Sequence, residues 1–192
     1  AVEKTGMPKG VFSLIHGGTR KVGQALVAHP LIKAVGFTGS TGGGRALFDI
    51  AVSRPEPIPF YGELGSNNPV FLLPKAMGEK AADIAKGWVA SLTMGVGQFC
   101  TNPGLLIALK GADLDTFVDT AASELGQIGG TAMLTDRVSS AYHEVTDAMT
   151  KHGKVTCALK RRDSDGKFEG SPAIFRTTAA DWKANPELAE EM

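Results

Sequence analysis

Apolar residues in the first fifty positions repeat one pattern twice: a run of β-branched and aromatic residues, a glycine-rich turn, and a segment with helical periodicity. The first copy predicts a strand over residues 11–15, a turn at 16–18 and a helix from about Thr19, its expected N-cap. The second predicts a strand over 33–38 and a helix over 42–52. Strands that alternate with short helices are typical of a parallel α/β sheet, which binds ligands at the carboxyl ends of its strands.

Three prolines within residues 54–59 exclude a helix there, and the domain boundary is expected between residues 59 and 60. The first predicted domain is therefore 1–59 and the second 60–192. The second domain is expected to hold a loop at 95–104, and its charged stretch at 160–166 reads as a solvated turn because it mixes both signs. Its apolar pattern predicts helices over 79–94, 114–125 and 136–151, and strands over 60–64, 70–73, 105–109, 155–159 and 173–177.

Composition narrows the class of protein. Twenty basic and twenty acidic residues give a net charge of zero among 192 residues, so the electrostatic footprint of a nucleic-acid or anionic-membrane binder is missing. No run of about eighteen apolar residues suggests a membrane span. The four histidines and two cysteines have no metal-ligand spacing, so we expect no metal site. Two cysteines cannot build a disulfide framework, which favours a reducing, cytoplasmic location.

Glycine is over-represented, at 24 of 192 residues against a usual share of about 7%. The glycines cluster in turns, where they allow a backbone to approach a ligand. The turn at 39–44 opens a predicted helix, whose N–H groups suit a phosphate. It matches neither the P-loop nor the dinucleotide fingerprint G-x-G-x-x-G, so an ordinary strand-to-helix connection is the alternative.

Two side chains could carry chemistry. Cys100 lies between Gly97 and Gly104 in the predicted loop, where a thiolate could act as a nucleophile; the alternative is a small buried hydrophobic residue. Glu63 ends an apolar strand before a glycine turn, a place for a general base or for an ordinary surface carboxylate. The asparagines that follow, Asn67 and Asn68, are expected to support left-handed turn geometry.

Several motifs, in order along the chain, resemble the NAD(P)-dependent aldehyde dehydrogenase superfamily. Gly36-Phe37-Thr38-Gly39-Ser40-Thr41 resembles its nucleotide-contacting turn. Glu63-Leu64-Gly65-Ser66 resembles its general-base motif, and Gly97-Gln98-Phe99-Cys100 resembles its nucleophile motif. Further similarity lies in Pro8-Lys9-Gly10-Val11-Phe12, Gly17, Gly23, His29-Pro30, and the final run Pro186-Glu187-Leu188-Ala189-Glu190-Glu191-Met192.

The resemblance implies an aldehyde dehydrogenase-like α/β fold. Residues 1–59 would form the C-terminal part of a Rossmann-like coenzyme domain, and 60–192 the N-terminal and central part of an α/β catalytic domain. It further implies a small-molecule aldehyde substrate, a homo-oligomeric full-length protein, Cys100 as nucleophile and Glu63 as base. The coenzyme, NAD or NADP, would be bound by Gly17, Gly23, Thr38, Gly39, Ser40, Leu64, Gly65 and Glu191.

Departures from the family pattern indicate a subfamily. Ser66 stands where a second glycine is usual, and Gly42 where a glutamate often follows Gly-Ser-Thr. Glu-Leu-Gly-Ser-Asn-Asn-Pro-Val-Phe together with Gly-Gln-Phe-Cys-Thr-Asn-Pro-Gly is similar to the α-ketoglutaric semialdehyde (2,5-dioxopentanoate) dehydrogenases. Because the family's oxyanion-stabilising asparagine and Phe-Gly-Pro element are not among these residues, we expect the chain to be an internal fragment of a larger enzyme, inactive by itself.

Three alternatives stay open at this point. A CoA-acylating relative would pass the acyl group to a thiol, although it would not need the water-activating carboxylate of Glu63. A binding or structural domain without catalysis is the second. A cysteine hydrolase is the third, and it lacks a histidine partner that spacing alone could identify.

Overall fold

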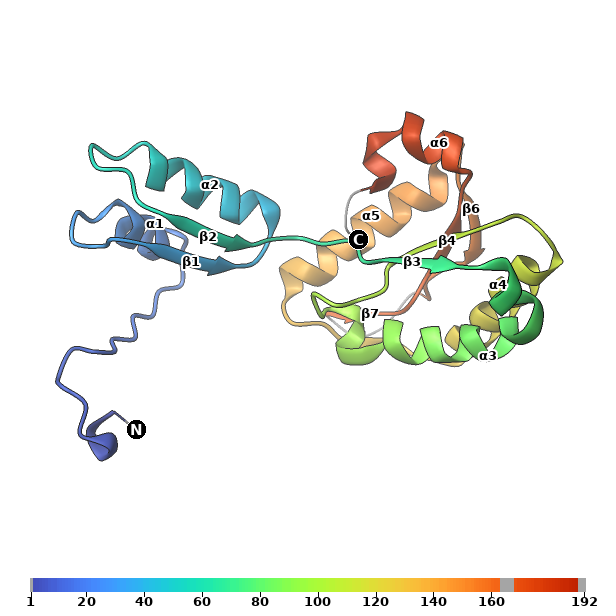
Figure 1. Ribbon diagram of the computed structural model, residues 1–192, viewed down its shortest axis with the longest axis horizontal. Helices are drawn as coiled ribbons and strands as arrows, with labels where there is room; N and C mark the ends of the chain where they lie inside the picture. Colours follow the sequence, from blue (N-terminus) through green and yellow to red (C-terminus); the bar gives the residue numbers. More distant parts are fainter. Residues whose placement is uncertain (1, 163–167, 190–192) are drawn as a thin grey trace. The chain divides into compact units, whose positions relative to one another are not determined.

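The computed structural model describes residues 2–162 and 168–189, which form two compact units, Ala1–Gly65 and Ser66–Met192 (Figure 1). The units meet after residue 65 and not at the expected 59/60 boundary. The reason is the strand β2 (Phe60–Glu63), which pairs in parallel with β1 (Val35–Thr38) of the first unit. The three prolines within residues 54–59 therefore lie inside the first unit and do not mark its boundary.

The first unit consists of a parallel strand pair and helices that cover it. After the 3-10 turn η1 (Glu3–Thr5) come α1 (Lys21–Ala28) and α2 (Thr41–Val52), and α2 lies along the β1–β2 pair (Figure 1). Helix α2 begins where the sequence predicts, because Ser40 Oγ accepts a hydrogen bond from the Gly43 N–H at 3.2 Å. Helix α1 begins after Arg20, without a side-chain cap, so the expected Thr19 cap is wrong. The buried core of the unit is Val27, Ala51 and Ile58.

The strand expected over residues 11–15 does not form. These residues have no regular structure, and side chains such as Phe12 and Leu14 are exposed. A lone apolar run has the composition of a strand, but a strand requires a neighbour for its backbone N–H and C=O groups. In the described part of the chain, no strand pairs with these residues.

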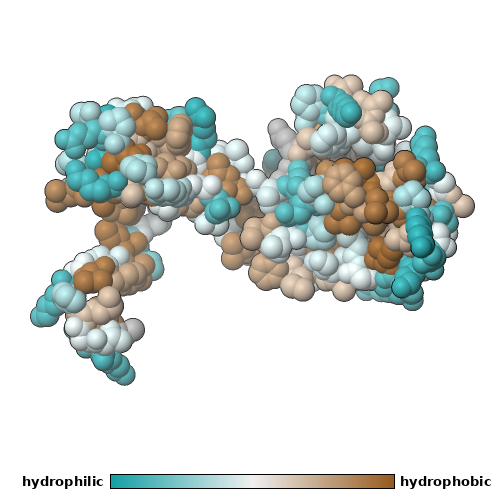
Figure 2. All heavy atoms as spheres, in the orientation of Figure 1, coloured by the Kyte–Doolittle hydropathy of each residue, from teal (hydrophilic) through white to brown (hydrophobic). Residues whose placement is uncertain are grey.

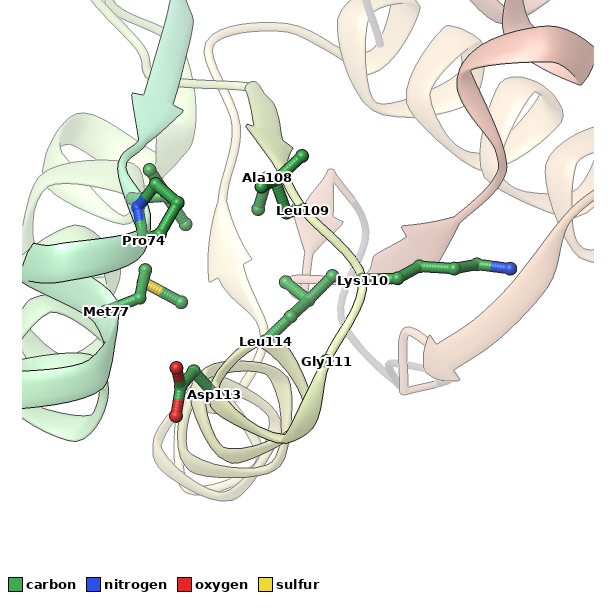
Figure 3. A pocket seen from close by; sticks show the side chains of 9 residues that line it. Pro74, Met77, Ala108, Leu109, Lys110, Gly111, Asp113 and Leu114 are labelled. Atoms are coloured by element: carbon green, nitrogen blue, oxygen red, sulfur yellow. The ribbon is translucent and has the colours of Figure 1, made fainter.

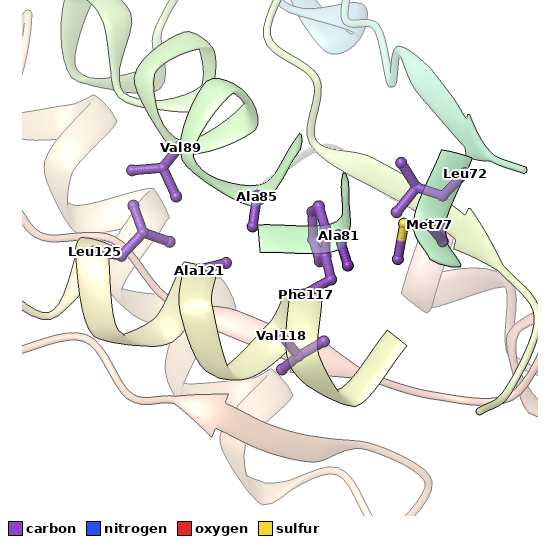
Figure 4. Close-up of a cluster of buried hydrophobic side chains, with 9 residues drawn as sticks. All are labelled: Leu72, Met77, Ala81, Ala85, Val89, Phe117, Val118, Ala121 and Leu125. Carbon is purple, nitrogen blue, oxygen red and sulfur yellow. The ribbon is translucent and has the colours of Figure 1, made fainter. Parts of the chain in front are cut away.

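The second unit is built around a parallel strand pair and two long helices. Strand β3 (Pro69–Leu72) pairs with β4 (Leu105–Ala108), and α3 (Pro74–Leu92) packs against α4 (Ala112–Leu125). Helix α3 starts at Pro74 and not near residue 79; Lys80 has a non-helical φ of −144°, and the regular apolar stripe begins only after it. Figure 4 shows the core between the helices: Leu72, Met77, Ala81, Ala85, Val89, Phe117, Val118, Ala121 and Leu125.

The remaining strands pair antiparallel, which the sequence did not predict. Strand β6 (Thr156–Leu159) pairs with β8 (Ile174–Arg176), and β5 (Thr131–Ala132) with β7 (Glu169–Gly170). Helix α5 (Asp136–Lys151) has the predicted bounds, because Thr135 Oγ1 caps it through the Val138 N–H. The unit also holds η2 (Met94–Gly97), α6 (Ala179–Ala184) and η3 (Pro186–Ala189).

Part of the charged stretch after β6 is buried, contrary to its interpretation as a solvated turn. The side chain of Arg161 is only 12% exposed; its Nη2 donates to Asp147 Oδ1 at 2.9 Å and its Nε to Thr146 Oγ1 at 3.1 Å. Tyr142, on the same helix, donates to the Ser171 carbonyl at 2.7 Å, and burial raises its pKa to about 12 against the opposing charge of Arg161. Arg161 thus links the segment that follows β6 to α5.

Apolar side chains also reach the surface of both units (Figure 2). On the β3–β4 pair they alternate: Leu72 and Ala108 contact the helical core, whereas Phe71 and its register partner Ile107 point away from it and are 64% and 42% exposed. Leu109 continues this outward face. A sheet face of this kind is usually covered by another layer.

Replacing Phe117 by alanine should lower the free energy of unfolding by about 3–5 kcal/mol. The ring is 1% exposed and stacks at a tilt on Trp88, with a centroid distance of 5.7 Å, so its removal leaves a cavity between α3 and α4. Urea denaturation measures the change. Asp119→Ala, on the exposed side of α4, is the control and should change stability by less than about 0.5 kcal/mol; an equal loss in both variants would contradict the packing argument.

Candidate active site

Cys100 lies in the loop between α3 and β4, and it is exposed. The three residues Gly95, Val96 and Gly97 just before it have left-handed φ angles of 59°, 60° and 73°. For a β-branched residue such as Val96 this conformation is unfavourable, and strained backbone of this kind is concentrated at functional sites. Since it is exposed within the described residues, Cys100 is not packed as a small buried hydrophobic residue. Cys157, the second cysteine, is half-buried on β6.

Side chains directly before β3 hold the backbone of this loop. Ser66 Oγ donates to the carbonyl oxygen of Cys100 at 2.9 Å, and Asn68 Nδ2 donates to the same oxygen at 2.8 Å and to the Asn102 carbonyl at 2.9 Å. Asn102 Nδ2 donates in turn to the Leu92 carbonyl at the end of α3, at 2.8 Å. Trp88 Nε1 donates to the Pro103 carbonyl at 2.9 Å. The loop is thus tied to β3 and to α3.

Sequence reasoning missed these contacts. It assigned Asn67 and Asn68 to left-handed turn geometry, but among the described residues only Val96 and Phe168 have a positive φ outside glycine. The asparagines instead donate side-chain hydrogen bonds over long sequence separations. The signal available in the sequence was Ser66 itself, a hydroxyl where the family pattern has glycine.

Glu63, Leu64 and Gly65 follow one another at the carboxyl end of β2. Glu63 is exposed, not in the apolar surroundings its neighbours suggest, and its carbonyl accepts from the Gly39 N–H at 3.0 Å. Leu64 is half-buried and packs against α2 at Gly44, where a Cβ would collide with the leucine side chain. Gly65 is exposed at the end of the first unit.

Within the first unit, the structure brings together some of the residues predicted to bind coenzyme. Thr38 is the register partner of Glu63, and Gly39 and Ser40 lead from β1 into α2, so they lie at the carboxyl ends of β1 and β2. Gly17 packs against α1, because a Cβ there would collide with Val22, and Gly23 lies inside α1 instead of in a turn. Gly17 and Gly23 therefore do not belong to one glycine turn.

The segment that leads to Glu191 is anchored at two points in the second unit, whereas Glu191 itself lies outside the described residues. Asn67 Nδ2 donates to the Ala189 carbonyl at 2.6 Å, and His152 Nε2 lies 3.3 Å from Glu187 Oε1. Hydrogen bonds from its own backbone N–H and from His152 lower the pKa of Glu187. Asn67 thus connects the residues directly before β3 to the segment at 186–189.

A shallow cavity lies at the opposite ends of β3 and β4 from Cys100. Figure 3 shows Met77 and Leu114 facing it from α3 and α4, with Asp113 at its edge. Ser66, Asn68 and Cys100 all precede β3 or β4, whereas the cavity follows both strands. None of the predicted site residues lines it.

Within residues 2–162 and 168–189, no three or more His, Cys, Asp or Glu residues are grouped so that they could hold a metal ion. Among the same residues, no helix is long and apolar enough to cross a membrane.

The fold places the chain among mixed α/β proteins with parallel strand pairs, and the clamped cysteine loop is its most distinctive local feature. The chain belongs to the aldehyde dehydrogenase family, whose family model matches residues 1–179. This confirms the resemblance inferred from the motifs and the aldehyde dehydrogenase-like α/β fold that it implied.

Two curated relatives carry the name of the subfamily that the motifs resemble. The chain is 56% identical over its whole length to α-ketoglutaric semialdehyde dehydrogenase 2 of Azospirillum brasilense and 38% identical to α-ketoglutaric semialdehyde dehydrogenase of Acinetobacter baylyi. It spans 37% and 36% of the lengths of these two proteins. Among solved structures, an NAD-dependent benzaldehyde dehydrogenase from Corynebacterium glutamicum superposes with a TM-score of 0.77 at 23% identity, covering 93% of this chain and 39% of that one.

Proposed function

We propose that the full-length protein oxidises α-ketoglutaric semialdehyde to the carboxylic acid with NAD or NADP as oxidant. The observation that carries this proposal is an exposed, backbone-clamped Cys100 in a chain 56% identical to a relative named for that substrate. A cytoplasmic, homo-oligomeric enzyme acting on a small aldehyde is the form we expect, without nucleic-acid or membrane partners.

Cys100 starts the proposed reaction. Its thiolate attacks the aldehyde carbon, forming a C–S bond and a hemithioacetal whose oxyanion is stabilised by hydrogen-bond donors that include the Cys100 N–H. The carbon–hydrogen bond then breaks to leave a thioester on Cys100. The bound coenzyme supplies the chemistry of this step by accepting the hydride.

The first unit fits the pyrophosphate of such a coenzyme. Helix α2 presents the N–H groups of its first turn, and Ser40 lies at its N-cap. A Cβ placed on Gly42 meets no atom within 4 Å, so the backbone there is open to a ligand. We assign Thr38, Gly39 and Ser40 to this contact, with Gly17, Gly23, Leu64 and Gly65 as further coenzyme residues, and Glu191 to the nicotinamide ribose.

Glu63 completes the proposed reaction. Its carboxylate removes a proton from a water molecule, the water oxygen attacks the thioester carbon, and the C–S bond breaks to release the acid and the Cys100 thiolate. The first unit, Ala1–Gly65, acts as part of a coenzyme domain and the second, Ser66–Met192, as part of a catalytic domain. Glu63 ends β2, at the same sheet edge as the turn that leads from β1 into α2.

Incubating the full-length protein with α-ketoglutaric semialdehyde and NAD or NADP should yield one reduced coenzyme and one carboxylic acid per aldehyde, without CoA. The isolated 192-residue chain should show no turnover and no tight NAD(P) binding. Mass spectrometry of the products decides the route. An acyl-CoA product that appears only with CoA would replace this function by the acylating one, and no oxidation at all would leave a binding role.

A further inference from the structure

We infer that Ser66 and Asn68 are positioning residues for Cys100: together they hold its carbonyl oxygen and so fix the backbone from which the thiol projects. This inference rests on the proposed function and adds two residues to it. Neither side chain is proposed to touch the aldehyde or the coenzyme.

The carbonyl oxygen of Cys100 receives two donors from one side of the loop. Ser66 Oγ lies 2.9 Å from it and Asn68 Nδ2 lies 2.8 Å from it. A carbonyl oxygen has two lone pairs, so these two bonds use its accepting capacity and define the plane of the peptide between residues 100 and 101.

Asn68 does more than hold one carbonyl. Its amide has two N–H groups, and the structure places the Asn102 carbonyl 2.9 Å from the same nitrogen. One side chain thus bridges two carbonyls two residues apart and fixes the turn between them. Asn102 extends the connection to the end of α3 through the Leu92 carbonyl. Cys100 is therefore exposed at the start of a backbone segment that is restrained from its own carbonyl to Asn102.

Restraint of this kind matters for a covalent nucleophile. Attack on a carbonyl requires the reacting atoms to approach within about 3–3.5 Å in an aligned geometry, and a displacement of about 1 Å can cost on the order of 100-fold in rate. The N–H of Cys100, which we assign to the oxyanion, also changes direction if the loop turns. The clamp, by which we mean the hydrogen bonds from Ser66 and Asn68 to the Cys100 carbonyl, keeps both the thiol and this donor in place before substrate arrives.

Ser66 makes the clamp a feature of this chain rather than of the whole family. Where the family pattern has glycine there is no hydroxyl to donate, so the second bond to the Cys100 carbonyl depends on the serine. Asn68 supplies the other bond from directly before β3, and this strand is in turn paired with β4, which follows the cysteine loop. The two donors thus lie directly before a paired strand.

The test uses the full-length enzyme and follows the single-turnover rate of coenzyme reduction. A neutral hydrogen bond stabilises the geometry it holds by a factor of about five. Ser66→Ala should therefore lower the single-turnover rate by about fivefold, and Asn68→Ala, which loses two bonds, by about 25-fold. The KM for aldehyde and the coenzyme affinity should not change. Ser66→Thr keeps the hydroxyl and should restore most of the rate, and Thr120→Ala, which removes a hydroxyl bonded only within α4, should have the wild-type rate.

Alkylation by iodoacetamide, mapped by peptide mass spectrometry, separates positioning from folding. Cys100 is exposed and Cys157 is half-buried, so the half-buried thiol reports loss of structure. In Ser66→Ala and Asn68→Ala both thiols should react at wild-type rates while coenzyme reduction slows. Faster alkylation of Cys157, or unchanged coenzyme reduction in both variants, would overturn the inference. Neither result would affect the proposed function, which is tested separately by the products of the wild-type enzyme and by the Cys100→Ser variant.

Discussion

Replacing Cys100 by serine is expected to abolish aldehyde oxidation by the full-length enzyme, lowering kcat by a factor on the order of 1,000 or more. The side chain remains similar in size, but a serine hydroxyl is a far weaker nucleophile than a thiolate and requires an adjacent base to act. Within the described residues, no histidine is hydrogen-bonded to Cys100 that could activate the serine. Steady-state coenzyme reduction with saturating aldehyde measures the loss.

Two controls make the result specific to the nucleophile. Cys157→Ser changes the second cysteine of these 192 residues, which is half-buried on β6, and should leave turnover at the wild-type level. Coenzyme binding by the Cys100→Ser enzyme, measured by titration, should equal that of the wild type because the residues assigned to the coenzyme are untouched. Retained aldehyde oxidation in Cys100→Ser would remove Cys100 from the mechanism.

Local patterns predicted those elements whose stability is largely local. Helix α5 has the predicted bounds because its apolar stripe and its Thr135 cap both lie within one segment. The core stripe of α3, from Ala81 to Val89, follows the same rule. The part of the helix from Pro74 to Gly78 was not predicted, and α3 ends at Leu92, two residues before the expected end. The residue types of Cys100 and Glu63, with the glycines beside them, likewise indicated candidate chemistry from a few neighbouring positions.

Features that depend on distant partners could not be predicted in this way. Residues 11–15 have strand composition, but forming a strand depends on a neighbour that no local pattern specifies. The β5–β7 and β6–β8 pairs join strands separated by helices and loops, so their antiparallel direction follows from tertiary packing. The clamp is of the same kind: Ser66 and Asn68 contact a residue more than thirty positions away, and only the fold identifies the acceptor.

Replacing Glu63 by glutamine is expected to stop the reaction at the thioester. The amide has almost the same shape as the carboxylate but cannot accept the proton of the attacking water, so hydrolysis should slow by about 100- to 10,000-fold. Formation of the thioester does not use Glu63 in the proposed mechanism. The first turnover should therefore proceed at its normal rate, giving a burst of one reduced coenzyme per site followed by a very slow steady state.

Intact-mass spectrometry of quenched Glu63→Gln enzyme should find the acyl group on Cys100, and peptide mapping should assign it to that residue. The matched control is Glu56→Gln, which removes an exposed carboxylate of the same unit that is 3.4 Å from Lys33 Nζ, and it should neither accumulate acyl-enzyme nor slow turnover. An unchanged steady-state rate in Glu63→Gln would remove the base role. A slow rate without acyl-enzyme would instead place Glu63 before hydride transfer, so the two measurements together decide which half of the reaction depends on this carboxylate.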